Sequence, residues 1–234
     1  MTFDLWNTLL IEKNYTQRRL AILREAITSE GEAVDPDALR EVYRTAQKRH
    51  DDLWSRDYRH YPLPERVDDI LRGVNAKLSQ AEKIWAMEKL GDTILEDPPI
   101  LTEGAAETVS RMAGIFRLGI ISDTGVTSGS KIKKLLDRRG ILKHFTVTIF
   151  SDETMVCKPR REAFEAALSV LEVKPSETLH VGDLLRTDVV GAKAACMMGV
   201  WLKIREPDAG NVTPDYTITK LSQLLDIPEI KERL

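Results

Sequence analysis

The chain has 234 residues, of which 42% are apolar and 30% charged, a composition typical of a globular protein with a core for one large or two modest domains. Its net charge of −3 excludes a global basic field, so we expect neither nucleic acid nor an anionic membrane as a partner. The two cysteines lie far apart, no apolar stretch reaches membrane-spanning length, and no secretion signal opens the chain. We therefore expect a cytoplasmic protein, and leave open a true start that precedes Met1.

The first ten residues form a short apolar and aromatic run that carries a single carboxylate, Asp4, and breaks at Asn7-Thr8. A carboxylate in a buried run is costly unless it is paired, hydrogen-bonded or bound to a metal. Asp4 is therefore a candidate functional acid at the end of a first strand. Taken alone, an aspartate near a strand end is more often a turn or capping residue.

Residues 13–98 have the pattern of a helical block. Apolar residues recur at helical spacing in successive segments, and Asp35-Pro36 marks one helix start with proline at the first helical position. Four amphipathic helices in a row with short connections predict a small helical bundle, which Asp97-Pro98-Pro99 closes.

From residue 99 onward, buried strands alternate with helices. Strands are predicted at 118–122, 146–150, 178–181, 200–204 and 216–218, and helices at 103–113, 130–139, around 164–171, before 198 and at 220–225. This alternation predicts an α/β fold, a parallel sheet with helices on both faces. The sheet domain would comprise residues 1–12 and 99–234, interrupted after its first strand by the helical domain of residues 13–98.

Polar residues follow four of these strands. Ligands of open parallel sheets bind at the carboxyl ends of the strands. The residues that the sequence places at or just beyond such ends are Asp4, Ser122, Asp123, Lys158, Asp183 and Asp188. Their convergence on one edge of one sheet makes them candidate site residues.

The chemistry that this set suits is phosphoryl transfer. Asp4 and Asp183, with Asp188 nearby, would give the hard oxygen ligands that Mg²⁺ prefers. Ser122 and Lys158 could hold phosphoryl oxygens and offset transition-state charge, and Asp4 could act as a nucleophile.

Each residue also has a plainer interpretation. Ser122-Asp123 could begin a turn, and Asp188 falls in the first turn of a predicted helix, where an acid is favoured by the helix dipole. Lys158, Arg160 and Arg161 crowd a helix start, where positive charge is disfavoured. A bound anion would explain them, and a solvated surface cluster is the alternative.

The pattern resembles the haloacid dehalogenase superfamily, mostly Mg²⁺-dependent phosphatases with an aspartate nucleophile. The matching pieces span nearly the whole chain: Phe3-Asp4-Leu5-Trp6-Asn7-Thr8-Leu9, Ile120-Ile121-Ser122-Asp123, Lys158-Pro159 and His180-Val181-Gly182-Asp183 with Asp188. The resemblance implies a Rossmann-like core and an inserted helical cap. By the same resemblance, Asp4 is the nucleophile and a metal ligand, and Thr8 supports the loop that carries it. Ser122 and Lys158 hold the phosphate, with Asp123 beside them. Asp183 binds the metal, and Asp188 supports that metal site.

One position departs from the family pattern. The phosphatases usually carry a second aspartate two residues after the nucleophile, as the general acid and base, and here that position is Trp6. Loss of a general acid–base typically costs on the order of 10²–10⁴ in rate. The backbone carbonyl of Trp6 could still bind the metal. Asn7 replaces the usual glycine, and asparagine tolerates left-handed conformations.

Three interpretations remain open. The first is a Mg²⁺-dependent phosphatase or phosphotransferase for a small phosphorylated metabolite, acting as a monomer or homodimer. Its leaving group would need little protonation, as in acyl phosphates, or its acid would come from the cap. The second is a 2-haloacid dehalogenase-like carbon-centre hydrolase, which the intact metal pattern disfavours. The third is a low-turnover protein that binds a phosphorylated ligand or regulates a partner.

The cap is expected to select the substrate by closing over the site. His50, Asp57, His60 and Glu65 are candidates for a cap acid, and Arg56, Arg59 and His60 for contact with an anionic substrate. For all of them an exposed or structural role is the simpler expectation.

Overall fold

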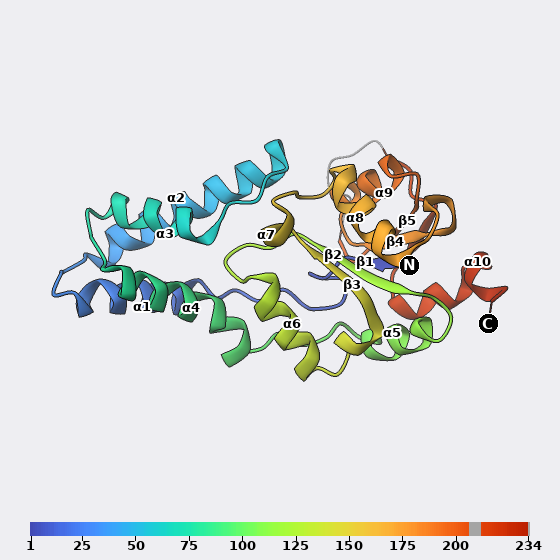
Figure 1. The fold of residues 1–234 in the computed structure, drawn as a ribbon, viewed down its shortest axis with the longest axis horizontal. Helices are drawn as coiled ribbons and strands as arrows, with labels where there is room; N and C mark the ends of the chain where they lie inside the picture. The colour runs from blue at the N-terminus through green and yellow to red at the C-terminus, as the bar shows by residue number, and fades with distance from the viewer. Residues whose placement is uncertain (206–211, 234) are drawn as a thin grey trace. The chain divides into compact units, whose positions relative to one another are not determined.

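A computed structural model describes residues 1–205 and 212–233 and divides the chain into two compact units (Figure 1). The first comprises Met1–Glu12, Pro99–Asp123 and Leu136–Leu234, and the second comprises Lys13–Pro98 and Thr124–Leu135. We describe each unit by itself.

The first unit is built on a parallel sheet of six strands in the order β3-β2-β1-β4-β5-β6. The strands are β1 Thr2–Phe3, β2 Leu118–Ser122, β3 Phe145–Phe150, β4 Leu179–Gly182, β5 Met198–Leu202 and β6 Tyr216–Ile218. β1 is only two residues long, yet it pairs with β2 on one side and β4 on the other. This order is that of a doubly wound Rossmann-like sheet, which confirms the predicted fold class.

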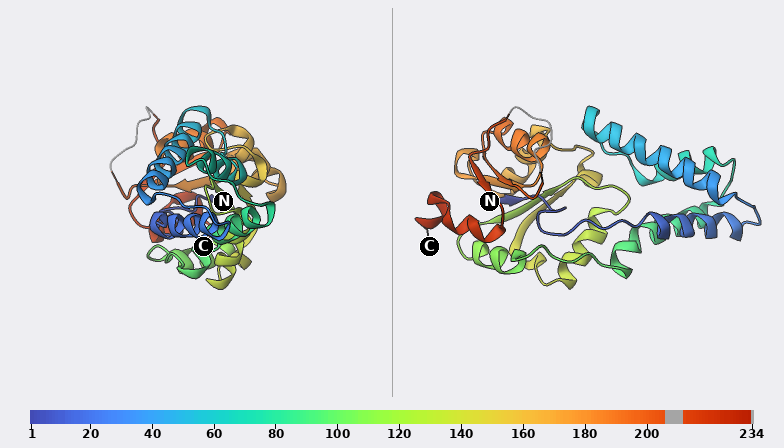
Figure 2. Two further views of the ribbon diagram at one scale, coloured as in Figure 1. Left: turned by 90° about the vertical axis from the view of Figure 1, so that its left-hand side faces the viewer. Right: turned by 180° about the vertical axis from the view of Figure 1, so that it is seen from behind.

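Helices alternate with these strands and cover the sheet. They are α5 Ala105–Ala113, α7 Ser151–Thr154, α8 Arg161–Leu171, α9 Val190–Ala194 and α10 Pro228–Lys231, with 3-10 turns at Leu142–His144, Pro175–Glu177 and Leu221–Asp226. Helix α6 Gly129–Arg138 belongs to the second unit as far as Leu135. Figure 1 and the reverse view in Figure 2 show α8 and α9 on one face of the sheet and α5 and α10 on the other. Under α8 and α9, Ile121, Phe164, Ala167 and Met197 pack into one buried cluster, because their strands and helices turn apolar faces toward each other.

The second unit contains four helices, α1 Thr16–Ser29, α2 Pro36–Asp52, α3 Leu63–Gly73 and α4 Gln80–Glu96, in the order that the sequence predicts. Asp35 caps α2, since its side chain accepts hydrogen bonds from the backbone N–H groups of Asp37 and Ala38. The helices bury one another's apolar faces around a cluster that includes Leu23, Leu39 and Ile70.

The segment 124–135 differs from the sequence-based division, which assigns it to the sheet domain. Val126 packs in the buried cluster of the helical unit, and Lys131 pairs with Glu88 and Asp92 of α4 at 2.7 and 2.6 Å. These contacts join residues far apart in sequence, so helical spacing alone does not show them.

Two helical turns are wider than predicted. α2 continues into a π-helical turn at Leu53–Asp57, which ends at Tyr58 in a left-handed conformation (φ 52°). A second π-helical turn at Leu185–Val189 precedes α9 and contains Asp188, where the sequence predicts an ordinary first helical turn. π-helical turns concentrate at functional positions in proteins.

Among the residues that the structure describes, no helix combines the length and apolar character needed to cross a membrane.

Gly191 in the sheet unit and Gly91 in the helical unit make a matched pair for testing how tightly the protein is packed around each glycine. A Cβ at residue 191 would lie 2.2 Å from Phe164 Cε2, whereas one at residue 91 meets only Lys131 Cγ at 3.6 Å. We expect Gly191→Ala to lower the free energy of unfolding by about 1–3 kcal/mol through overpacking. Gly91→Ala should raise it by about 0.5–1 kcal/mol, because alanine favours the helix. Urea denaturation of both variants tests this, and a neutral Gly191→Ala would contradict the packing.

Candidate functional site

Asp4 is fixed at the switch point of the sheet by the strand that precedes it. β1 ends at Phe3, and the Asp4 backbone N–H donates to the Val181 carbonyl at 2.8 Å, which continues the pairing with β4 for one more residue. Its side chain is 8% exposed. The prediction that Asp4 lies buried at a strand end is thus met by the geometry.

The end of β4 brings two further carboxylates to the same place. Asp183 directly follows Gly182, and its backbone carbonyl accepts a hydrogen bond from the Trp201 indole N–H at 3.0 Å. Asp188 packs directly against Gly182, since a Cβ at residue 182 would lie 2.2 Å from Asp188 Cγ. Glycine is the residue that permits this close approach.

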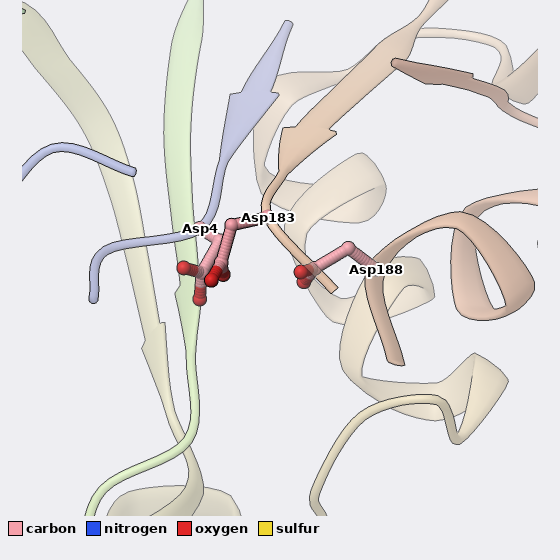
Figure 3. A group of neighbouring side chains, drawn as sticks. All are labelled: Asp4, Asp183 and Asp188. Atoms are coloured by element: carbon pink, nitrogen blue, oxygen red, sulfur yellow. The ribbon is translucent and has the colours of Figure 1, made fainter. Parts of the chain in front are cut away.

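Asp4, Asp183 and Asp188 form one group of buried acids (Figure 3). One carboxylate oxygen from each lies within 4.8 Å of the other two. Oxygen donors at this spacing match the chemistry of a hard divalent cation such as Mg²⁺. The donor set therefore fits the predicted metal.

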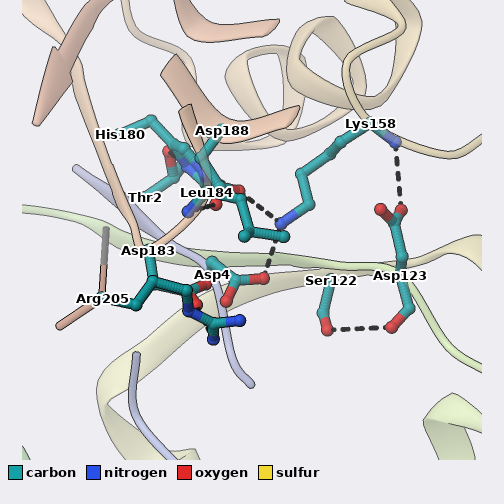
Figure 4. Close-up of polar contacts among 10 residues, drawn as sticks. All are labelled: Thr2, Asp4, Ser122, Asp123, Lys158, His180, Asp183, Leu184, Asp188 and Arg205. Carbon is teal, nitrogen blue, oxygen red and sulfur yellow. Dashed lines mark hydrogen bonds and ion pairs between the residues drawn. The ribbon is translucent and has the colours of Figure 1, made fainter. Parts of the chain in front are cut away.

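Lys158 joins two of these acids (Figure 4). Its ammonium donates to Asp4 Oδ1 at 2.5 Å and to Asp188 Oδ1 at 2.7 Å, and its side chain is 3% exposed. The backbone N–H of Lys158 in turn donates to Asp123 Oδ1 at 3.0 Å. Lys158 is therefore no part of a solvated surface cluster.

The charges of the group shift one another's pKa values. Burial raises the pKa of Asp4, with Lys158 acting against this and the neighbouring acids reinforcing it. Burial would raise the pKa of Asp188 as well, but Lys158 and His180 hold it below its usual range. Burial opposes the charge of Lys158, yet the surrounding carboxylates keep its pKa above normal. Lys158 is shared between Asp4 and Asp188 and therefore offsets their charge only in part.

His180 positions Asp188 and was not among the predicted site residues. The ring Nε2 lies 3.2 Å from Asp188 Oδ1, and Nδ1 lies 2.9 Å from the hydroxyl of Thr2. Burial lowers the pKa of His180. Because a carboxylate can only accept, the Nε2–H of the ring donates to Asp188, while Nδ1 faces the hydroxyl of Thr2. A sequence signal for this role exists, because Thr2 and His180 are polar residues inside strands that are otherwise apolar.

Arg205 is the other residue that sequence reasoning missed. Its guanidinium donates to Asp183 Oδ2 at 2.5 Å while its own side chain stays about half exposed. Burial raises the pKa of Asp183, and Arg205 acts in the opposite direction. Arg205 follows β5, whose end carries no motif, so nothing in the sequence points to it.

The remaining predicted residues lie at the same edge of the sheet. Ser122 ends β2, is 2% exposed and contacts the Asp123 carbonyl with its hydroxyl at 3.4 Å. Asn7 adopts the left-handed conformation (φ 56°) that its residue type permits. Thr8 is fully buried, and its hydroxyl has no hydrogen-bond partner in the described part of the chain. Metal binding by the Trp6 carbonyl stays a prediction.

The cap candidates separate into two groups within the helical unit. Arg56, Asp57, Arg59 and Glu65 are exposed. His60 is buried and His50 half-buried, and burial together with nearby positive charge lowers the pKa of His50 to about 4.

The amino-acid sequence of the chain was compared with those of known families and proteins. Residues 1–195 match the family model described as haloacid dehalogenase-like hydrolase. A glyceraldehyde 3-phosphate phosphatase from Pyrococcus furiosus is 32% identical over 178 residues, 71% of this chain and 70% of that protein. The pyrophosphatase PpaX from Anoxybacillus flavithermus is 29% identical over 177 residues, 73% of each protein. Further curated relatives match over about half of their own length.

Solved structures share the fold over the whole chain. A 2-haloacid dehalogenase from Pseudomonas syringae pv. Tomato DC3000 superimposes with a TM-score of 0.68 at 24% sequence identity, covering 99% of this chain and 97% of that one. At this identity the likeness concerns the fold and carries no statement about the reaction.

Replacing Lys158 tests the buried ion pairs directly. We expect Lys158→Met to lower the free energy of unfolding in EDTA by about 3–5 kcal/mol, because it leaves buried carboxylates without a partner. Urea denaturation measures this. The control is Lys193→Met, which removes the partly exposed pair with Asp215 and should cost at most about 1 kcal/mol. Equal effects of the two substitutions would contradict the assignment.

Proposed function

The chain belongs to the haloacid dehalogenase-like hydrolases, and from this membership we propose that it is a Mg²⁺-dependent phosphatase or phosphotransferase of small phosphorylated metabolites. The observation that carries the proposal is the Lys158 ammonium between Asp4 and Asp188, inside a group of three buried acids. The phosphatases among its relatives support the reaction class.

In this proposal Asp4 is the nucleophile. An Asp4 oxygen attacks phosphorus, the bond from phosphorus to the leaving-group oxygen breaks, and an aspartyl phosphate forms on the protein. Water then attacks that phosphorus, releases inorganic phosphate and regenerates the Asp4 carboxylate. Lys158 holds Asp4 in place from one oxygen, which fixes the orientation of the carboxylate.

Mg²⁺ would be held by Asp4, Asp183 and the Trp6 carbonyl, with Asp188 supporting the site. When bound, it supplies a Lewis acid that polarises the phosphoryl oxygens. Ser122 and Lys158, at the same edge of the sheet, would hold phosphoryl oxygens and offset their growing charge.

Trp6 limits which substrates such a site can turn over. An indole at this position cannot donate a proton to a leaving oxygen or accept one from water. Leaving groups that depart as stable anions, as acyl phosphates provide, avoid this requirement. We therefore propose acyl phosphates or other substrates with good leaving groups.

The first test is phosphate release from acetyl phosphate and p-nitrophenyl phosphate, with Mg²⁺ and with EDTA. We expect turnover that needs Mg²⁺ and that Asp4→Asn abolishes, because the amide cannot act as the nucleophile. Asp137→Asn, an exposed acid on α6, is the control and should retain activity. Absence of turnover on both compounds would overturn the proposal and favour a ligand-binding protein without catalysis.

A second test restores the missing acid. We expect Trp6→Asp to raise kcat/KM for an alkyl phosphate by a factor on the order of 10²–10⁴ while changing acetyl phosphate far less, because only the poor leaving group needs the proton. Trp6→Asn has nearly the same shape without an acid and should give no such gain. An equal response of the two variants would show that the tryptophan acts through its bulk instead.

A further inference from the structure

Two side chains, one from β5 and one from the segment after it, hold Asp183. The indole N–H of Trp201, inside the strand, donates to the Asp183 backbone carbonyl at 3.0 Å. The guanidinium of Arg205, after the strand has ended at Leu202, donates to Asp183 Oδ2 at 2.5 Å (Figure 4). The Asp183 side chain is only 3% exposed, so groups of the protein must offset its charge, and Arg205 is the cation in direct contact with it.

The two contacts fix different parts of Asp183. Trp201 is 7% exposed and clusters with buried Leu185 and Val189, so its N–H is a rigid donor to the backbone that follows β4. The side chain of Arg205 is 46% exposed, and in the described part of the chain the Asp183 carboxylate is the only group that forms an ion pair with it. The position of the Asp183 backbone therefore does not depend on Arg205.

Lys158, the other cation in contact with these acids, differs from Arg205 in its burial. It is 3% exposed and is bonded to Asp4 and Asp188, so leaving them would strand its charge inside the protein. Arg205 has nearly half of its side chain in solvent and can leave Asp183 without burying its own charge. Of the two cations, Arg205 is therefore the one that can be exchanged for another.

A metal ion bound to Asp183 would share the single negative charge of that carboxylate with Arg205. Each cation then reduces what the other gains from the carboxylate, and the two cations also repel each other at short range. We propose that Arg205 is a displaceable counter-ion of Asp183, which neutralises the carboxylate in the metal-free protein and which a divalent cation must displace in order to bind. The inference rests on the proposed function, because it concerns the same Mg²⁺ site.

The opposite role would be to orient Asp183 for the metal. Hydrogen-bond partners behind a metal ligand commonly strengthen metal binding, and their loss weakens the affinity by about 10- to 100-fold. Trp201 fits this role, because it holds Asp183 from a buried position and carries no charge that opposes a cation. Arg205 carries such a charge, so the two residues should affect metal affinity with opposite signs.

The first measurement is the affinity of the metal-free protein for Mg²⁺ by isothermal titration calorimetry, at constant pH and ionic strength. We expect Arg205→Met to bind Mg²⁺ about 3- to 30-fold more tightly, because one like charge is removed from beside a divalent ion. Arg205→Lys keeps the charge and should stay within about 3-fold of the wild-type protein. Trp201→Phe should bind about 10-fold more weakly. Unchanged or weaker binding by Arg205→Met overturns the proposal.

The matched control is Lys203→Met, in the same segment of the chain. Lys203 is exposed, and its ammonium lies 5.6 Å from the centre of the Trp201 ring, without an ion pair to any acid of the site among the described residues. The substitution removes the same charge from the same region and should change Mg²⁺ affinity by less than about 3-fold, because solvent screens it. An equal gain in Lys203→Met would reduce the effect to net charge and contradict a specific role of Arg205.

A second measurement, urea unfolding in EDTA and in saturating Mg²⁺, tests the role of Arg205 in the metal-free protein. In EDTA we expect Arg205→Met to unfold at a lower urea concentration than the wild-type protein, because the buried Asp183 carboxylate loses its partner. Mg²⁺ should then raise the unfolding midpoint more in the variant than in the wild type, because tighter binding stabilises the folded state more. Equal midpoints in EDTA overturn the counter-ion role.

The two proposals can fail separately. Asp4-dependent phosphate release, together with the same Mg²⁺ affinity in Arg205→Met and in the wild type, refutes only the counter-ion. Tighter Mg²⁺ binding by Arg205→Met, without phosphate release from acetyl phosphate or p-nitrophenyl phosphate, refutes only the proposed reaction. Absence of Mg²⁺ binding in every variant refutes both.

Discussion

The buried ammonium of Lys158 is the interaction on which the rest of the site depends. It contacts carboxylates from two separate parts of the chain, Asp4 after β1 and Asp188 in the π-helical turn, and its own backbone is held by Asp123. Each of these groups would be unfavourable alone at this depth, because burial disfavours the charged form of every one of them. Each stabilises the charge of the others, so the carboxylate of Asp4 is held firmly although the strand before it has only two residues.

Much of this arrangement could be predicted because it follows from local pattern and topology. The alternation of buried strands with helices indicated a parallel sheet, and the rule that ligands bind at the carboxyl ends of strands brought Asp4, Ser122, Lys158, Asp183 and Asp188 to one edge. Strand ends shifted by one or two residues, as at β4 and β5, without moving these residues from the edge.

What could not be predicted consists of contacts between residues that no pattern links. Arg205 reaches Asp183 across the end of the sheet, and His180 pairs with Thr2 on the adjacent strand. The segment 124–135 packs with the helical unit through Val126, although in sequence it continues directly from β2. Likewise, Arg66 looks in the sequence like one more charged residue of an amphipathic helix, and only its burial distinguishes it.

The two units differ in the groups that surround their buried charges. The sheet unit gathers more carboxylates than cations, so it gains from a divalent cation. The helical unit instead encloses the guanidinium of Arg66 among neutral groups, the side-chain oxygen of Gln47 and the ring of Tyr43. In the proposed function, Trp6 lacks the group that would move a proton, while the acids and Lys158 that would hold metal and phosphate are present. A preference for good leaving groups would then follow from the loss of proton transfer and not from weaker binding.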